Sequence, residues 1–357
     1  VSSSNSDYNM KYVVFNGKDC NTAGIHGAAC TLYSNKGVSE VVRTDTGEYD
    51  VHWTEPYPHN DYVILTTSNG QYWGGAFASI GGSDDVFASF GVSRYFVHVE
   101  TRKLGTSNSN INSDYIVVVA QPDFATKYVS FYGDECIGQG QYGTTCTTLL
   151  SRGILEVVPV STAIYRVYFT ESMQTSNYLV FATSNVEGTN GAITNIGGNN
   201  DALSADYGVS PLSTVIRTRG ISDNTAKASD YVSFVVAGTP SNTSSTKWVT
   251  FNGQDCSGSG LHGITCTIFG SNGVLEVDRI SSGKYRIYWT LSFADNGYVL
   301  LCDSNVQSTG GTVCIIGGNN DAVGSAYAIS TQFAEIQTRT MASNSWADSD
   351  YISVLAF

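Results

Sequence analysis

The chain has 357 residues, of which 41% are hydrophobic and 14% are charged, and its formal net charge is −13. An acidic protein is not expected to bind nucleic acid or anionic membranes, since both require basic surface. No apolar run approaches the roughly 20 residues of a spanning helix, so membrane insertion is not expected either. The chain starts at Val1, and we interpret it as a processed or partial chain.

Short β-strands are predicted along the first third of the chain. These stretches are rich in Val, Tyr, Phe, Ile and Thr, and turn-forming residues bound them. In chain order they are Tyr12–Asn16, Ala29–Ser34, Val38–Thr44, Tyr49–Thr54, Tyr62–Thr67, Tyr72–Ile80, Phe96–Thr101 and Tyr115–Ala120. Alternation with a period of two over Tyr49–Trp53 indicates a strand with one buried face. Asp45–Gly47 is typical of a hairpin turn before that strand.

The same pattern occurs three times. Each copy begins at a lysine and ends at the aspartate of a Ser-Asp-Tyr sequence: Lys11 and Asp114, Lys127 and Asp230, Lys247 and Asp350. The separation is 103 residues in every copy (114−11, 230−127, 350−247). A repeat of this length is expected to form a domain of its own.

We therefore predict an all-β fold with three tandem domains. Each is expected to be an antiparallel β-sandwich of the jelly-roll type with about eight strands. The predicted boundaries are an N-terminal tail over residues 1–10 and domains over 11–122, 123–240 and 241–357. One glycine follows the first strand of each domain, and we expect a positive φ angle at all three: Gly17, Gly133 and Gly253.

The eight cysteines predict disulfides. Six of them recur as pairs ten positions apart: Cys20 and Cys30, Cys136 and Cys146, Cys256 and Cys266. Cys302 and Cys314 occur only in the third copy, and their separation of 12 suggests neighbouring strands of one hairpin. Disulfide pairing predicts an even number of cysteines, with the two additional ones in the same copy, and this is what the sequence shows. Disulfides in turn indicate an oxidising or extracellular setting. The alternative is reduced thiols packed as small hydrophobic side chains.

A zinc site could be built from Cys20, His26 and Cys30. The second copy has Tyr142 where the third has His262, and no fourth ligand recurs. We therefore expect no metal at this position.

No catalytic residues are predicted. Among the five histidines only one position repeats, and no nucleophile elbow, zinc-protease motif or phosphate loop is present. The recurring carboxylates Glu40, Glu156 and Glu276 are expected on a solvated strand face. The aspartate of each Ser-Asp-Tyr sequence is expected to form a turn.

A loop of two glycines followed by polar residues is the candidate binding loop. Its candidate residues are Asp84, Asp85, Asn199, Asn200, Asp201, Asn319, Asn320 and Asp321. Their side-chain oxygens could bind Ca²⁺ or sugar hydroxyls. The alternative is a glycine-rich turn in which Asn and Asp adopt left-handed geometry. No other cofactor is expected.

The order of these motifs resembles the repeat of bacteriophage tail-fibre and other virion fibre proteins. In the first copy the matching stretches are Val14-Phe15-Asn16-Gly17, Gly47-Glu48-Tyr49 and Asn60-Asp61-Tyr62-Val63. The third copy follows the same order, whereas the second has Ala163-Ile164-Tyr165 in place of Gly-x-Tyr. The resemblance covers all three copies and carries no catalytic signature. It implies non-enzymatic β domains on a virion fibre and a homo-oligomer, because such fibres are often trimers.

The expected function is that of a structural or adhesive fibre protein at the virion surface or outside the cell, in contact with a cell-surface glycan or receptor. The alternative is a subunit of a secreted bacterial filament or surface adhesin, held by contacts between copies of itself. The paired cysteines fit poorly with assembly in a reducing bacterial cytoplasm, although a bridge could close after lysis, and this keeps a secreted fibre or adhesin open. A glycan depolymerase would need paired carboxylates in a groove, and no copy departs from the repeat in that way.

Overall fold

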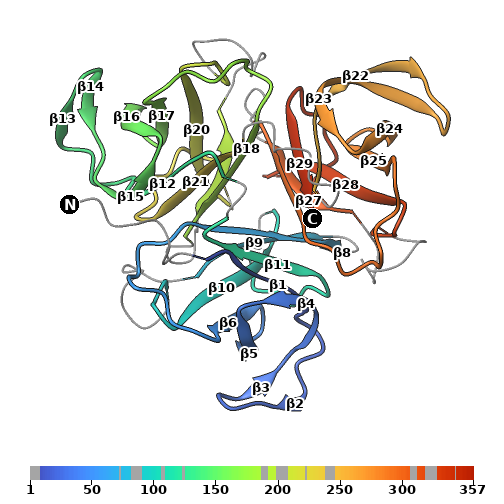
Figure 1. Cartoon of the computed structure of the whole chain (residues 1–357), viewed down its shortest axis with the longest axis horizontal. Coiled ribbons are helices and arrows are strands. Elements are labelled where there is room, and N and C mark those ends of the chain that lie inside the picture. Colours follow the sequence, from blue (N-terminus) through green and yellow to red (C-terminus); the bar gives the residue numbers. More distant parts are fainter. Residues whose placement is uncertain are drawn as a thin grey trace.

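The computed structural model describes residues 9–71, 74–81, 91–105, 109–122, 125–185, 192–197, 208–221, 223–237, 246–305, 312–317, 328–341 and 343–357 (Figure 1). Within these ranges the protein is all-β, as predicted, and its sheets are antiparallel. The same ranges hold no helix that could cross a membrane.

The first copy forms two sheets. Its strands are β1 (Lys11–Asn16), β2 (Thr22–Ala23), β3 (Ala28–Ala29), β4 (Thr31–Lys36), β5 (Val38–Asp45), β6 (Glu48–Trp53), β7 (Ile64–Ser68), β8 (Gly70–Gln71), β9 (Gly74–Ile80), β10 (Phe96–Lys103) and β11 (Ile116–Ala120). The strand order is β4-β1-β11-β7 in one sheet and β2-β3-β5-β6-β10-β9-β8 in the other.

The second copy repeats this order. Its strands are β12 (Lys127–Phe131), β13 (Gly138–Gly140), β14 (Gly143–Thr145), β15 (Thr148–Arg152), β16 (Ile154–Ser161), β17 (Ile164–Phe169), β18 (Leu179–Ser184), β19 (Ala192–Ile196), β20 (Ser213–Gly220) and β21 (Val232–Ala237). Two four-stranded sheets follow the orders β15-β12-β21-β18 and β16-β17-β20-β19, and β13 pairs with β14.

In the third copy the two sheets are joined into one. Its strands are β22 (Lys247–Ser259), β23 (Ile264–Asn272), β24 (Val274–Ser281), β25 (Lys284–Trp289), β26 (Leu300–Ser304), β27 (Thr312–Ile316), β28 (Phe333–Thr340) and β29 (Ile352–Ala356). The order is β26-β29-β22-β23-β24-β25-β28-β27. The joining occurs because β22 and β23 run on through positions where the first copy breaks into separate short strands.

The predicted alternation is present in one strand of each copy. Strands β6, β17 and β25 share one burial pattern, in which the second, fourth and sixth residues are buried and the others are half-buried. In β6 the buried residues are Tyr49, Val51 and Trp53. Asp45–Gly47 does form the turn into this strand, and Gly47 has φ 71°.

The glycines after the first strands have a different cause from the one expected. None of Gly17, Gly133 and Gly253 is among the residues with a positive φ angle. A Cβ atom at Gly17 would instead overlap the hydroxyl of Tyr49, which donates a hydrogen bond to the Gly17 carbonyl oxygen (3.1 Å). Tyr165 and Tyr285 occupy the same place in the other copies. Close approach of a buried tyrosine therefore requires glycine here.

The three copies form a ring. Figure 1 shows their strands as three groups around a common centre. The tyrosine of each Ser-Asp-Tyr sequence is buried in a neighbouring copy, where its hydroxyl donates to a backbone carbonyl oxygen. These bonds are Tyr115 to Tyr298 (2.8 Å), Tyr231 to Tyr62 (2.7 Å) and Tyr351 to Tyr178 (2.5 Å). The first copy thus contacts the third, the second contacts the first, and the third contacts the second.

Strand pairing between the copies follows the same cyclic order as the tyrosine contacts. Isolated parallel bridges join copies at equivalent positions: Asn69 with Ile316, Ile80 with Asn185, and Ile196 with Asn305. Strands β11, β21 and β29 are buried at every position. In β11, Ile116 and Val118 belong to the core of the first copy, whereas Val117 and Val119 belong to a cluster shared with the third copy. Burial of both faces explains the largely apolar sequences of these strands.

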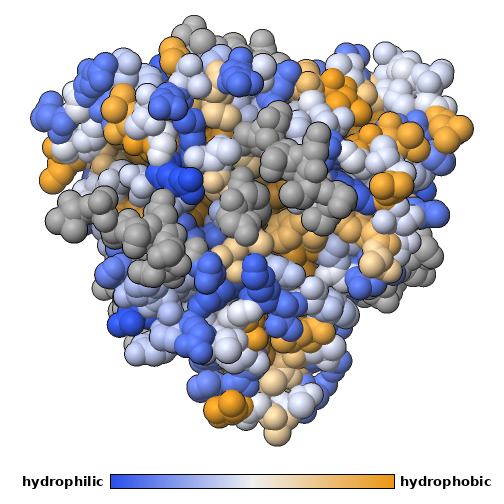
Figure 2. Space-filling model, in the orientation of Figure 1, coloured by the Kyte–Doolittle hydropathy of each residue, from blue (hydrophilic) through white to orange (hydrophobic). Residues whose placement is uncertain are grey.

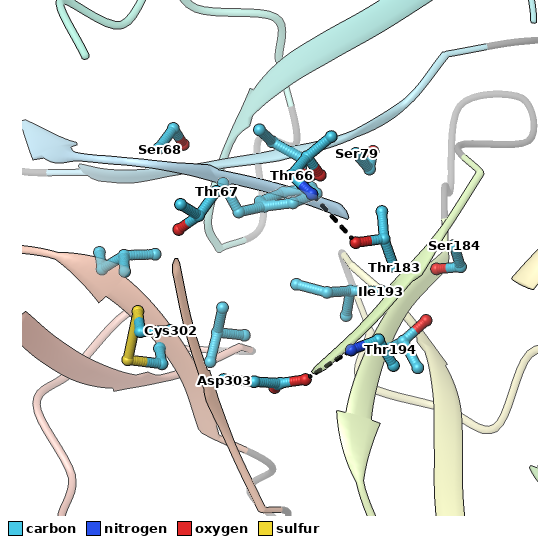
Figure 3. A pocket seen from close by; sticks show the side chains of 16 residues that line it. Thr66, Thr67, Ser68, Ser79, Thr183, Ser184, Ile193, Thr194, Cys302 and Asp303 are labelled. Atoms are coloured by element: carbon cyan, nitrogen blue, oxygen red, sulfur yellow. Dashed lines mark hydrogen bonds between the residues drawn. A yellow bond between two sulfur atoms is a disulfide. The ribbon is translucent and has the colours of Figure 1, made fainter. Parts of the chain in front are cut away.

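A cavity of about 40 Å³ lies where the copies meet (Figure 3). Two hydrogen bonds cross between copies at its wall. The Thr66 amide donates to Thr183 Oγ1 (3.2 Å), and the Ala182 amide donates to Asp303 Oδ2 (3.0 Å). Complete burial raises the pKa of the Asp303 carboxyl well above its usual range.

Cys302 and Cys314 also lie at this cavity and are joined by a disulfide. The expectation that they sit on hydrogen-bonded neighbours of one hairpin is wrong. Strands β26 and β27 are the two edge strands of the third copy's sheet and are not hydrogen-bonded to each other. The disulfide therefore links the first and last strands of the sheet order. The first copy has a hydrogen bond in the same place, from Thr66 Oγ1 to the carbonyl oxygen of Ala78 (2.8 Å).

Candidate functional site

Three loops project from the corners of the ring. We call each a finger and define it by its disulfide: Cys20–Cys30, Cys136–Cys146 and Cys256–Cys266. In Figure 1 they are the outlying hairpins labelled β2 and β3, β13 and β14, and the outer ends of β22 and β23. The described cysteines are all in disulfides, which is consistent with an oxidising environment.

A buried carboxylate fixes each finger to the sheet below it. Glu40 accepts hydrogen bonds from the backbone amides of Ile25 (3.0 Å) and His26 (3.2 Å). Glu156 and Glu276 bind the equivalent amides at 2.7–3.0 Å. The expectation of a solvated strand face is therefore wrong, because these side chains are buried and satisfy donors of the loop.

The protonation of this carboxylate follows from its contacts. Burial acts to raise the pKa of Glu40, but hydrogen bonds from the His26 ring and from the Ile25 amide outweigh it, and the net pKa is lowered. The pKa of Glu276 is lowered in the same way by His262 and Leu261. The ionised form that holds the finger is thus favoured at neutral pH.

Glycine is required where each finger meets its carboxylate. A Cβ atom at Gly24, Gly140 or Gly260 would overlap a carboxylate oxygen of Glu40, Glu156 or Glu276, respectively. The finger therefore lies directly against its anchor. Together with the disulfide at its base, this contact gives an exposed loop a fixed conformation.

Each finger places one aromatic ring over the sheet, and we call this side chain the finger ring. It stacks face to face on a ring of the strand beneath. The pairs, with centroid distances and interplanar angles, are His26 on His52 (4.0 Å, 5°), Tyr142 on Tyr168 (4.1 Å, 16°) and His262 on Tyr288 (3.9 Å, 11°). The repeated position therefore calls for a flat ring, which both histidine and tyrosine supply.

The finger surfaces are apolar and exposed. Ile25 is 88% exposed and Leu261 is 79% exposed, although both are held by the carboxylate contact of their own amides. Figure 2 shows apolar side chains at the ends of the corners. No Asp, Glu, Lys or Arg lies between the two cysteines of any finger. An exposed apolar loop held in one conformation is typical of a contact surface.

Other predicted site residues are accounted for differently. The sulfurs of Cys20 and Cys30 are bonded to each other, so they are not zinc ligands, and the described residues contain no cluster suited to a metal ion. The Nδ1 atom of His98 lies 2.6 Å from Asp50 and the side chain is buried. The eight residues of the Gly-Gly-polar loop, from Asp84 to Asp321, lie outside the described ranges.

Sequence reasoning missed two features of the molecule. The first is the finger ring, because His26 and Tyr142 were compared as metal ligands and not as aromatic rings. The signal that could have found it is Gly-x-His/Tyr-Gly, which stands at Gly24–Gly27, Gly140–Gly143 and Gly260–Gly263. The second is the tyrosine of Ser-Asp-Tyr, which joins the copies.

The comparison with protein families returned no match to this sequence. A search of curated proteins likewise returned no significant similarity.

Proposed function

We propose that this chain is a non-enzymatic adhesive and structural protein displayed outside the cell as part of a virion fibre, in which the three fingers make the contacts. The observation that carries this proposal is that all three copies repeat the whole finger. Each finger has a disulfide, a glycine against a buried glutamate, and a stacked aromatic ring. Strands of the first and third fingers are paired with the sheet below, yet the finger tips themselves remain exposed. A binding surface that must keep its shape requires an exposed loop to be held in this way.

The role of the polar residues supports a binding function over a catalytic one. The recurring glutamates of the fingers are occupied by backbone amides. At the repeated histidine position the side chain acts as a stacked aromatic ring, and the second copy has a tyrosine there. A reaction would depend on an ionisable group there, whereas a contact depends on shape.

We also propose that each copy is one β-sandwich domain and that copies of this chain associate further in the assembled fibre. The recurrence of the strand order in the three copies supports the first point. The resemblance to virion fibres supports the second. Light scattering of the purified chain tests association directly, and a strictly monomeric mass at high concentration would contradict it.

A secreted filament or surface adhesin is the second candidate. The four disulfides favour it, because secretion delivers a chain to an oxidising compartment before it assembles. Negative-stain microscopy separates the two candidates. Helical filaments made of this chain alone would exclude the virion fibre.

Adhesion itself is tested by co-sedimentation of the labelled full chain with a panel of bacterial cells. The double variant Ile25→Ser, Leu261→Ser changes only exposed tips and is expected to lower the bound fraction at least tenfold. The matched control is Leu291→Ser, since Leu291 is 69% exposed and lies outside the fingers. Equal binding of the parent and the double variant would refute finger-mediated adhesion.

A further inference from the structure

We propose that the three finger rings form stacking platforms for a neutral saccharide. This inference rests on the proposed adhesive function and names the ligand class of the same fingers. The apolar C–H face of a sugar ring would lie on the outward face of His26, Tyr142 or His262.

The first step of the argument concerns which part of the ring is free. His26 has one face covered by His52 at 4.0 Å, and the same holds for Tyr142 and His262 on their partners. The His26 side chain is nevertheless 51% exposed, residue Tyr142 is 51% exposed, and the His262 side chain is 37% exposed. A ring that is covered on one face and keeps this exposure presents its opposite face to solvent. Each finger therefore offers a flat aromatic surface.

The ring is also fixed in place, which lowers the entropic cost of binding. Nδ1 of His26 contacts Glu40, and the His26 backbone amide donates to the same carboxylate. The supporting His52 ring rests in turn on Phe96, at 5.5 Å between centroids. In the third copy Tyr288 rests on Phe333 in the same way (6.0 Å). The aromatic contacts therefore continue from the finger ring to two neighbouring strands, β6 and β10 in the first copy and β25 and β28 in the third.

Charge selects a neutral ligand over the alternatives. The finger loops carry no acidic or basic residue apart from histidine, and the formal net charge of the whole chain is −13. Anionic polysaccharides would be repelled by the net field. A cation would need the electron-rich face of Trp, Tyr or Phe, which among the three finger rings only Tyr142 provides. A flat ring is the property shared by all three fingers, and the flat C–H face of a neutral sugar matches it.

Three platforms on one rigid body suit a repetitive polymer. A single stacked sugar binds weakly, but linked sites raise the apparent affinity by about 10²–10⁴ when they engage together. The proposal therefore predicts measurable binding to polysaccharides and weak binding to monosaccharides.

The test is affinity electrophoresis of the full chain in gels that contain one polysaccharide each. The neutral probes are dextran, mannan and galactomannan, and the anionic probes are alginate and dextran sulfate. We expect retardation by at least one neutral probe and none by the anionic ones. The triple variant His26→Ala, Tyr142→Ala, His262→Ala is expected to weaken retardation at least tenfold. The variant His26→Tyr, His262→Tyr keeps every ring and is expected to retain it.

The matched control is Trp346→Ala, because Trp346 is 49% exposed and belongs to no finger. Three results would overturn the proposal: no neutral probe retards the parent, the triple alanine variant behaves like the parent, or Trp346→Ala abolishes retardation. Finger-dependent adhesion to cells that is lost after protease treatment, without retardation by any polysaccharide, would show a protein ligand. That result would overturn the saccharide and leave the adhesive function standing.

Discussion

The hydroxyl of Tyr231 donates a 2.7 Å hydrogen bond to the backbone carbonyl oxygen of Tyr62, a residue 169 positions earlier in a different copy. Both side chains are fully buried. Tyr231→Phe keeps the ring and removes the donor, leaving the Tyr62 carbonyl oxygen unsatisfied. We expect a loss of about 1–3 kcal/mol in the free energy of unfolding, measured by urea denaturation.

Tyr95→Phe is the control for that measurement, because Tyr95 is 62% exposed. It should leave the unfolding midpoint unchanged. The ring arrangement further implies that Tyr231→Phe shifts one common transition for the whole chain. A variant in which only part of the fluorescence change moves would show that the copies unfold independently.

Ala163 has a φ angle of 61°, at the position where the first and third copies have glycine with φ 71° and 64°. A left-handed conformation costs an alanine about 1–2 kcal/mol, part of which is offset by its lower entropy in the unfolded chain. Ala163→Gly should therefore stabilise the protein by about 0.5–1 kcal/mol. The reverse change Gly47→Ala should destabilise it, since a Cβ there would lie 2.6 Å from the Thr101 carbonyl oxygen. Thermal unfolding should show a higher melting temperature for Ala163→Gly and a lower one for Gly47→Ala.

Asp303 is the buried carboxyl at the centre of the ring, and its counterpart in the second copy is Thr183. Thr183 accepts a hydrogen bond from a backbone amide through its hydroxyl oxygen, as Asp303 does through an oxygen of its carboxyl group. Asp303→Thr should keep that bond and remove an ionisable group. We expect the variant to be more stable than the parent at neutral pH, because the parent has to take up a proton or bury a charge at Asp303 when it folds.

The pH dependence provides the check. The folded pKa of Asp303 lies above the usual value of 3.8, so the folded state holds its proton more tightly than the unfolded state does. Stability from this group is present in full below pH 3.8 and is lost as the pH rises towards the folded pKa. The advantage of Asp303→Thr should accordingly be small at pH 3.5 and grow as the pH rises. An advantage that does not change with pH would show that the fold does not raise the pKa of Asp303.

The Cys302–Cys314 disulfide stands where the first copy has a hydrogen bond between Thr66 and Ala78. Removing the bridge with Cys302→Ala, Cys314→Ala should cost about 3 kcal/mol for a loop of this length. Cys302→Thr, Cys314→Ala recreates the pair of the first copy and should recover about 1 kcal/mol of that loss. Denaturation under non-reducing conditions compares the two variants. Equal stability would mean that the threonine does not form the bond in the third copy.

Much of the strand pattern could be predicted from the sequence. Alternation over Tyr49–Trp53 identified a half-buried strand because side chains on a strand point to opposite faces in turn. The turn at Asp45–Gly47 could be predicted because glycine readily adopts the positive φ angle that such a turn requires. Such signals are local, and a single copy contains them completely.

The packing between copies could not be predicted in the same way. The run Ile116–Val119 shows that both faces of a strand are buried, but not that a neighbouring copy covers one of them. Glu40 was misjudged because a glutamate on a strand usually faces water. Only the amides of Ile25 and His26, brought back over it by the disulfide, make its burial favourable.

The cyclic order of the tyrosine contacts has a consequence for how the molecule can associate. Each copy inserts one tyrosine and receives one, so the closed circuit of Tyr115, Tyr231 and Tyr351 leaves no socket of this kind vacant among the described residues. A linear array built on the same contact would end in an open socket and could grow without limit. The ring of three described copies is closed with respect to this contact, and association between such rings has to use other surfaces.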